Sequence, residues 1–126
     1  MLSGCGATPY QSEGIFGGYS DWALEDENTF SVMYSGNGDL NLMVAREYAL
    51  LRCAVLTKEK GFEYFEILEQ SQKLNKANVG TGAANIYVYK PTVKIAIKLV
   101  TVNSDDAYNA KELISNLTTK HDIAEY

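Results

Sequence analysis

The segment TVKIAIKLVTV, residues 92–102, decides the fold. Large apolar side chains occupy every second position up to residue 99, and smaller or charged side chains stand between them. The apolar series is Val93, Ile95, Ile97 and Leu99, and the alternate series is Thr92, Lys94, Ala96, Lys98 and Val100. A period of two is typical of a strand with one buried face. The segment therefore predicts a sheet that is covered on one side.

Three further strands are predicted around this segment. Residues 29–35 alternate in the same way, and the turn residues Gly36-Asn37-Gly38 end that strand. The other two strands are predicted at residues 62–69 and 86–89. Residues 70–85 are polar and small, which predicts a long loop between them. Pro91 has no N–H for a sheet ladder, so it predicts a break, a bulge or a strand edge.

Two helices complete the pattern. The first is predicted over residues 42–60, with Asp39 or Asn41 as its N-cap and Gly61 after its end. The second is capped by Asp105 or Asp106 and carries an amphipathic stripe. The stripe consists of Ala107, Ala110, Leu113, Ile114 and Leu117. The order β-α-β-β-β-α predicts an α+β fold, with an antiparallel or mixed sheet of about four strands and the helices packed on one face.

Length and composition allow a single folded domain. The chain has 126 residues, 46% of them hydrophobic, which is enough for a core. Residues 29–126 are predicted to form the α+β domain, and the glycine-rich residues 1–28 a tether. Aromatic side chains recur along the tether: Tyr10, Phe16, Tyr19 and Trp22. We expect its first half to be mobile and residues 17–21 to lie docked on the domain.

Charge is distributed unevenly along the chain. Residues 1–45 carry six acids and no lysine or arginine, whereas residues 46–126 carry eleven bases and ten acids. A nucleic-acid-binding protein needs a basic face to displace counterions from phosphates. A peripheral membrane protein needs basic residues beside anionic lipid. The net charge of −5 therefore disfavours both classes.

The N-terminal residues predict a lipid anchor. Leu2-Ser3-Gly4-Cys5 has the form of a lipobox. In such a site the thiol of Cys5 is modified with diacylglycerol, and Cys5 then becomes the N-terminal residue of the mature protein. A signal segment with an apolar run of roughly 7–15 residues normally precedes such a site. Only Met1 stands before Leu2 here, so we expect a chain made without that segment to be soluble.

A series of motifs carries a resemblance to a known family. The series contains Thr8-Pro9-Tyr10, Gly17-Gly18-Tyr19-Ser20-Asp21, Tyr48-Ala49-Leu50-Leu51-Arg52, Gly61-Phe62-Glu63-Tyr64-Phe65 and Tyr108-Asn109-Ala110-Lys111-Glu112. With the lipobox, this order resembles a family of small Gram-negative lipoproteins of unknown function. The resemblance covers most of residues 2–118. It implies lipidation of Cys5 and, because Gly6 follows, a periplasm-facing position at the outer membrane.

Residues that usually carry chemistry do not form a catalytic pattern, so we expect no enzyme activity and no cofactor. His121 is the only histidine and lies near the C-terminus, where a helix end frays. Cys53 lies in an apolar helical run, which predicts a buried free thiol with a raised pKa. The acidic run at residues 21–27 lacks a calcium-loop pattern, so we expect no metal site.

Two groups of residues remain as candidates for binding. Lys90, Lys94 and Lys98 recur at even spacing, so one continuous strand would present them on one face, either as a solvent face or to an anionic partner. Arg46 and Arg52 lie on the first helix with Tyr48. Arg52 falls where the helix is otherwise apolar. It predicts a structural ion pair, or a ligand pocket under the segment that holds Tyr19 and Asp21.

These observations favour a lipid-anchored structural or interaction module of the cell envelope, with an unknown envelope protein or ligand as its partner. The sequence also leaves open whether the protein forms a homo-oligomer. The alternative is a periplasmic domain that binds a small ligand or peptide between residues 17–21 and Arg52.

Overall fold

A computed structural model describes residues 7–14 and 17–124 of the chain. It contains one sheet of five strands and two helices, which confirms the α+β class. The elements are β1 (Gly18–Ala23), β2 (Thr29–Ser35), α1 (Leu42–Glu59), β3 (Tyr64–Asn78), β4 (Tyr87–Val100), β5 (Ala107–Asn109) and α2 (Ala110–Lys120). All neighbouring strands are antiparallel, in the order β1-β2-β4-β3-β5. The predicted number and order of strands were wrong.

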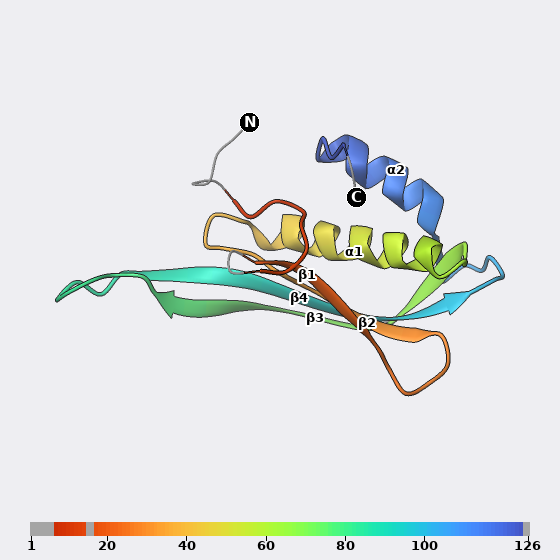
Figure 1. Cartoon of the computed structure of the whole chain (residues 1–126), viewed down its shortest axis with the longest axis horizontal. Helices are drawn as coiled ribbons and strands as arrows, with labels where there is room; N and C mark the ends of the chain where they lie inside the picture. Colours follow the sequence, from red (N-terminus) through yellow and green to blue (C-terminus); the bar gives the residue numbers. More distant parts are fainter. Residues whose placement is uncertain (1–6, 15–16, 125–126) are drawn as a thin grey trace.

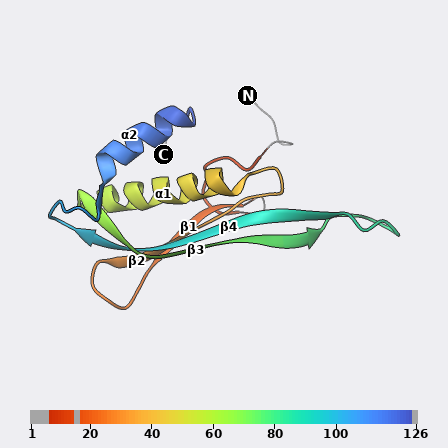
Figure 2. The same cartoon turned by 180° about the vertical axis from the view of Figure 1, so that it is seen from behind.

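The elements form three layers. Helix α1 lies across one face of the sheet, and α2 lies on the outer side of α1 (Figure 1). The view from behind shows the same stacking (Figure 2). Both helices are on one side of the sheet, as predicted, but α2 packs mainly on α1 and contacts the sheet at β5. Within the described residues, the other face of the sheet carries no helix.

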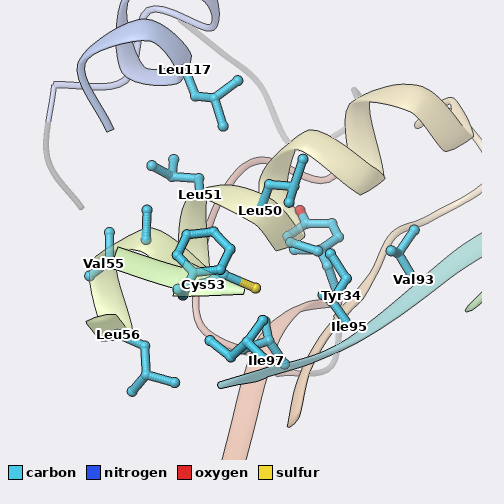
Figure 3. Close-up of a cluster of buried hydrophobic side chains, with 14 of the residues drawn as sticks. Tyr34, Leu50, Leu51, Cys53, Val55, Leu56, Val93, Ile95, Ile97 and Leu117 are labelled. Carbon is cyan, nitrogen blue, oxygen red and sulfur yellow. The ribbon is translucent and has the colours of Figure 1, made fainter. Parts of the chain in front are cut away.

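The position of α1 between two layers explains its composition. Apolar or small residues of α1 occur on all sides of the helix, and nine of its residues are buried. A helix that is apolar all round is one that is buried all round. In Figure 3, Ile95 and Ile97 of β4 lie on one side of α1 and Leu117 of α2 lies on the other. The core is therefore continuous from the sheet through α1 to α2.

The regular segments form where the pattern predicts them. Strand β2 has the predicted bounds, and α1 begins at Leu42 as predicted. The side chain of Asn41 caps α1 by accepting the N–H of Val44 at 2.8 Å. Lys60 is the C-cap, and Gly61 follows with a φ of +85°, a conformation that favours glycine. In β4 the apolar series from Val93 to Leu99 is buried against the helix side, as predicted.

Two expectations about the middle of the chain were wrong. The predicted loop at residues 70–85 is largely strand, because β3 continues to Asn78. The strands predicted at residues 86–89 and 92–102 are one strand, with Pro91 buried inside it. The carbonyl of Pro91 accepts the N–H of Gly36 at the point where β2 ends. In an antiparallel sheet the backbone N and C=O of one residue face the same neighbouring strand. The nitrogen of Pro91 therefore also faces Gly36, just beyond the last residue of β2 that pairs with β4, so the missing N–H falls where that pairing has ended.

The sheet also begins and ends outside the predicted limits. Strand β1 pairs with β2, so the predicted boundary between residues 28 and 29 lies within one hairpin. Residues 11–13 also follow the outer edge of β1: the Tyr19 N–H bonds the carbonyl of Gln11, and the Glu13 N–H bonds the carbonyl of Tyr19. Thr8 is buried on the domain, which contradicts a mobile first half for the described part of the tether. Near the C-terminus, Ala107 lies in β5, and Asn109 rather than Asp105 or Asp106 caps α2.

A two-stranded arm extends from the sheet. Strand β2 pairs with β4 only from Thr92 to Lys98, whereas β3 and β4 remain paired as far as Asn78 and Tyr87. Figure 1 shows this hairpin running well past the end of α1. The β3–β4 arm, defined here as residues 73–92, therefore has neither a helix nor a third strand beside most of its length.

Candidate functional site

Four of the predicted site residues meet on the helix-covered side of β1. Tyr19 and Asp21 face α1 because their partners in β2, Tyr34 and Val32, do so. Tyr48 and Arg52 stand one turn apart on α1 and point the same way. The Arg52 Nε–H donates to Oδ2 of Asp21 at 2.6 Å, and the guanidinium carbon lies 4.6 Å from the centre of the Tyr19 ring. The predicted ion pair of Arg52 is confirmed.

Aromatic rings continue from this ion pair into the core. Tyr10 stacks on Tyr19 with the ring centres 4.9 Å apart, and its ring meets the edge of Tyr48 at 5.9 Å. Tyr48 in turn meets Tyr34 at 5.2 Å. The hydroxyl of Tyr34 donates to the backbone carbonyl of Pro9. We call Tyr10, Tyr19, Tyr34 and Tyr48 the tyrosine cluster; it attaches the N-terminal segment to α1.

Burial dominates the electrostatics of this cluster. Loss of water contact raises the pKa of Tyr10 and Tyr34 well above the ordinary value for a phenol. Burial acts to lower the pKa of Arg52, but the hydrogen bond and charge of Asp21 outweigh it and raise that pKa. The Arg52 side chain is only 12% exposed, and Glu59 lies 3.4 Å from its Nη2. These shifts keep the phenols of Tyr10 and Tyr34 neutral and the guanidinium of Arg52 charged near neutral pH.

The remaining predicted cations are elsewhere. Arg46 leaves the cluster, and its Nε–H donates to Oε1 of Gln70 in β3 at 3.1 Å. Lys90, Lys94 and Lys98 lie on one continuous strand and on the helix-free face, as the even spacing predicts.

Acidic and aromatic side chains are interleaved with this lysine row. Glu66 is the cross-strand partner of Lys98, and Glu69 is the partner of Ala96. The ammonium of Lys94 lies 5.6 Å from the centre of the Trp22 ring. The face is therefore of mixed charge.

A second charged cluster has no counterpart in the predictions. His121 was expected at a frayed end, but it caps α2, and its Nε2 lies 2.7 Å from Oε1 of Glu47 on α1. Lys120 donates to the other carboxylate oxygen of Glu47 at 2.8 Å. Burial acts to raise the pKa of Glu47, but these two hydrogen bonds outweigh it and lower that pKa. The partners are 73 and 74 residues apart in the chain, so local sequence contains no signal for this contact.

The cysteines divide between the core and the N-terminus. Cys53 is a fully buried free thiol, as predicted, and burial raises its pKa far above the ordinary range. Cys5 and the rest of the lipobox lie outside the described residues. Within residues 7–14 and 17–124, histidine, cysteine and carboxylate side chains form no group of three that could hold a metal ion.

The β3–β4 arm carries a group of exposed apolar side chains. Five apolar side chains on the arm and its tip are about half exposed: Leu74, Val79, Ile86, Tyr87 and Tyr89. Leu74, Tyr87 and Tyr89 share the face that continues the helix-covered side, because they pair with or alternate with Pro91. The ammonium of Lys76 lies 4.3 Å from the ring centre of Tyr87. Sequence reasoning missed this surface because it predicted a loop there.

Neither described helix is long and apolar enough to cross a membrane. The lipid anchor thus remains a prediction from the sequence. The chain matches no known family model, no curated protein and no solved structure.

Proposed function

We propose that this protein is a lipid-anchored interaction module of the cell envelope. Cys5 attaches it to the outer membrane, and the domain faces the periplasm. The β3–β4 arm contacts another envelope protein. The observation that supports this function best is the arm, where apolar side chains stand exposed on a hairpin that extends beyond the core.

Such an arm is costly unless it has a partner. A two-stranded hairpin is marginally stable in water, and its stability normally comes from a third strand or a packed helix. Here β2 stops at Ser35 and α1 begins at Leu42, so neither covers the outer part of the arm. Clustered apolar residues on a projecting element are typical of a protein contact site. Tyrosine suits such a site because its ring buries area while its hydroxyl remains hydrated.

The alternative function, binding of a small ligand near Arg52, has less support. The guanidinium of Arg52 already contacts Asp21, Tyr19 and Glu59. In addition, the ring of Tyr10 stacks on that of Tyr19. A ligand would have to displace an ion pair that is largely shielded from water. We also propose no catalytic activity, because the tyrosine cluster and the Glu47 cluster serve to join one element to another.

Site-specific photo-crosslinking in intact cells tests the proposal. A photoreactive residue replaces Tyr89 on the arm in one strain and Met43, an exposed apolar residue on α1, in a matched strain. The protein is expressed behind a lipoprotein signal segment so that Cys5 can be modified. We expect a discrete adduct with another envelope protein from position 89 and none from position 43.

Substitutions on the β3–β4 arm provide a second, independent test. Leu74→Ser with Tyr87→Ser should abolish the adduct from position 89, while Met43→Ser with Val102→Ser should preserve it. Both pairs remove similar exposed apolar surface. Adducts of equal yield in the two strains, or from positions 89 and 43 alike, would show that the arm is not the contact site.

A further inference from the structure

Within the residues that the structure describes, the outer edge of β3 has no partner strand from Leu68 to Leu74. Strand β5 pairs only with residues 64–66 of β3. From Leu68 to Leu74 every residue is exposed. An edge of this length presents backbone N–H and C=O groups that can pair with another strand. The opposite edge of the sheet differs, because residues 11–13 cover β1.

The sequence of this edge is complementary to itself. Residues 68–74 are Leu-Glu-Gln-Ser-Gln-Lys-Leu. Read in reverse, the segment keeps leucine, glutamine and serine in place and exchanges only glutamate for lysine. An antiparallel pair centred on Ser71 therefore places Glu69 of each strand opposite Lys73 of the other. It also places glutamine opposite glutamine, and Leu68 and Leu74 meet at the two ends of the pair, where the β3–β4 register shifts between Ile67 and Glu69.

We propose that β3 pairs with β3 of a second copy of this chain, antiparallel and centred on Ser71. The result is one sheet of ten strands across two chains. Opposite charges on directly opposed residues stabilise antiparallel pairs, and like charges destabilise them. Lysine on an edge normally discourages pairing with other strands. Here each lysine meets a glutamate only when the partner is this same segment, so the charges select a second copy.

The faces of the two sheets also match in this arrangement. Glu69 and Lys73 pair with Ala96 and Thr92 of β4, so both lie on the helix-free face. A twofold axis perpendicular to the sheet keeps that face common to both copies. With about 4.8 Å between strands, the two copies of β4 lie about 14 Å apart. Helix α1 packs mostly over β4, with β2 and β3 to either side, so two helices with diameters of about 10–12 Å fit side by side at that spacing.

The ends of the pairing are defined by β5. Toward β5 the register of β3 with β4 shifts between Ile67 and Glu69, so Glu66 and Lys76 lie on opposite faces of the sheet. Asp105 and Asp106 lie beside Glu66 and Ile67 at the entrance to β5. The regular pairing therefore ends at Leu68, before these residues, and the second copy's arm leaves the joint sheet there.

This pairing does not depend on the proposed envelope function. It uses the backbone edge of β3, whereas the proposed contact with another protein uses the apolar face of the arm; Leu74 belongs to both surfaces, and Tyr87 and Tyr89 belong to the arm alone. It is also measured on purified protein without a lipid anchor, so either proposal can fail alone.

A charge-swap experiment tests the register. In the Cys5→Ser full chain, sedimentation gives the dimerisation constant of the parent, Glu69→Lys, Lys73→Glu and the double variant. We expect the parent and the double variant to dimerise and each single variant to dimerise at least tenfold more weakly. An equal mixture of the single variants should form heterodimers, because each lysine then faces a glutamate. Glu25→Lys and Lys111→Glu, exposed residues away from the β3 edge, should dimerise like the parent.

A disulfide test locates the twofold axis. Ser71 is its own partner in this register, and opposed Cα atoms in antiparallel pairs are about 4.5–5.5 Å apart, within the range of a disulfide. Ser71→Cys in the Cys5→Ser background should therefore form a covalent dimer under mild oxidation, and Lys111→Cys should not. A parent that stays monomeric, single variants that do not recover in the mixture, or equal crosslinking at positions 71 and 111 would overturn the proposal.

Discussion

Replacement of Arg52 by methionine tests the role of the tyrosine cluster as a structural connection. The change keeps most of the aliphatic stem and removes the guanidinium that bonds Asp21 and stacks on Tyr19. A hydrogen bond to a charged group contributes about 1.5–3 kcal/mol, and a cation–π contact about 0.5–1 kcal/mol. Because the Arg52 and Asp21 side chains are 12% and 21% exposed, solvent screens the pair only partly. We expect Arg52→Met to lower the free energy of unfolding by about 2–3 kcal/mol.

The measurement is urea unfolding with thermal melting as a second readout. An entropy of unfolding of about 2.1 cal/mol/K per residue converts this loss into a decrease in Tm of about 8–11 °C for a chain of 126 residues. Arg46→Met is the matched control, since it removes the same group from an exposed hydrogen bond to Gln70. That change should alter stability by less than about 0.5 kcal/mol.

A double-mutant cycle isolates the pair itself. Asp21→Asn alone should cost about 1 kcal/mol because it keeps an acceptor and removes the charge, and its effect should nearly vanish in the Arg52→Met background. A coupling energy of about 1 kcal/mol is therefore expected. Equal losses from Arg52→Met and Arg46→Met, or effects of Asp21→Asn and Arg52→Met that simply add, would refute the connection.

Three further changes have defined outcomes. The hydrogen bonds that lower the pKa of Glu47 stabilise the folded state fully above the unfolded pKa of about 4.3, and this stabilisation is lost as pH falls through the lower folded pKa. In urea titrations, the stability advantage of the parent protein over Glu47→Gln should therefore shrink between about pH 5 and pH 3. Cys53 should react with a soluble maleimide slowly in the native state and rapidly in denaturant, and fast native labelling would place the thiol at the surface. With a signal segment present, Cys5→Ala should move the protein from the membrane fraction to the soluble fraction, because acyl chains contribute about 0.8 kcal/mol per CH₂; equal membrane retention would count against the anchor.

The elements that were predicted correctly are those with two different faces. In the inner part of β4, the face toward α1 is buried and the other face is exposed or half-buried, so the burial pattern is written directly into the sequence. Strand β2 carries the same alternation of residue types, although Thr29 and Ser31 on its other face are buried as well. The N-cap and C-terminal residues of α1 supply similarly local signals. For such segments, periodicity and capping contain the required information.

The errors have a common physical cause. Residues 68–74 of β3 are exposed on both faces, so no alternation distinguishes this strand from a loop. Pro91 fits inside β4 because β2 happens to end beside it, which only the register reveals. In the candidate site, Arg52 was recognised as a charge in an apolar helix. Its specific bond to Asp21 and the contact of Glu47 with His121 depend on elements 31 and 74 residues away.

The position of β4 in the sheet determines when the chain can fold. Strand β4 is the neighbour of both β2 and β3, yet its segment is made after both of them. Thr29 finds its partner Lys98 only after 69 further residues have been added. Loops of this length make folding slow compared with that of proteins whose contacts are local. During synthesis, β2 and α1 therefore remain without the strand that covers them until residues 87–100 have been added.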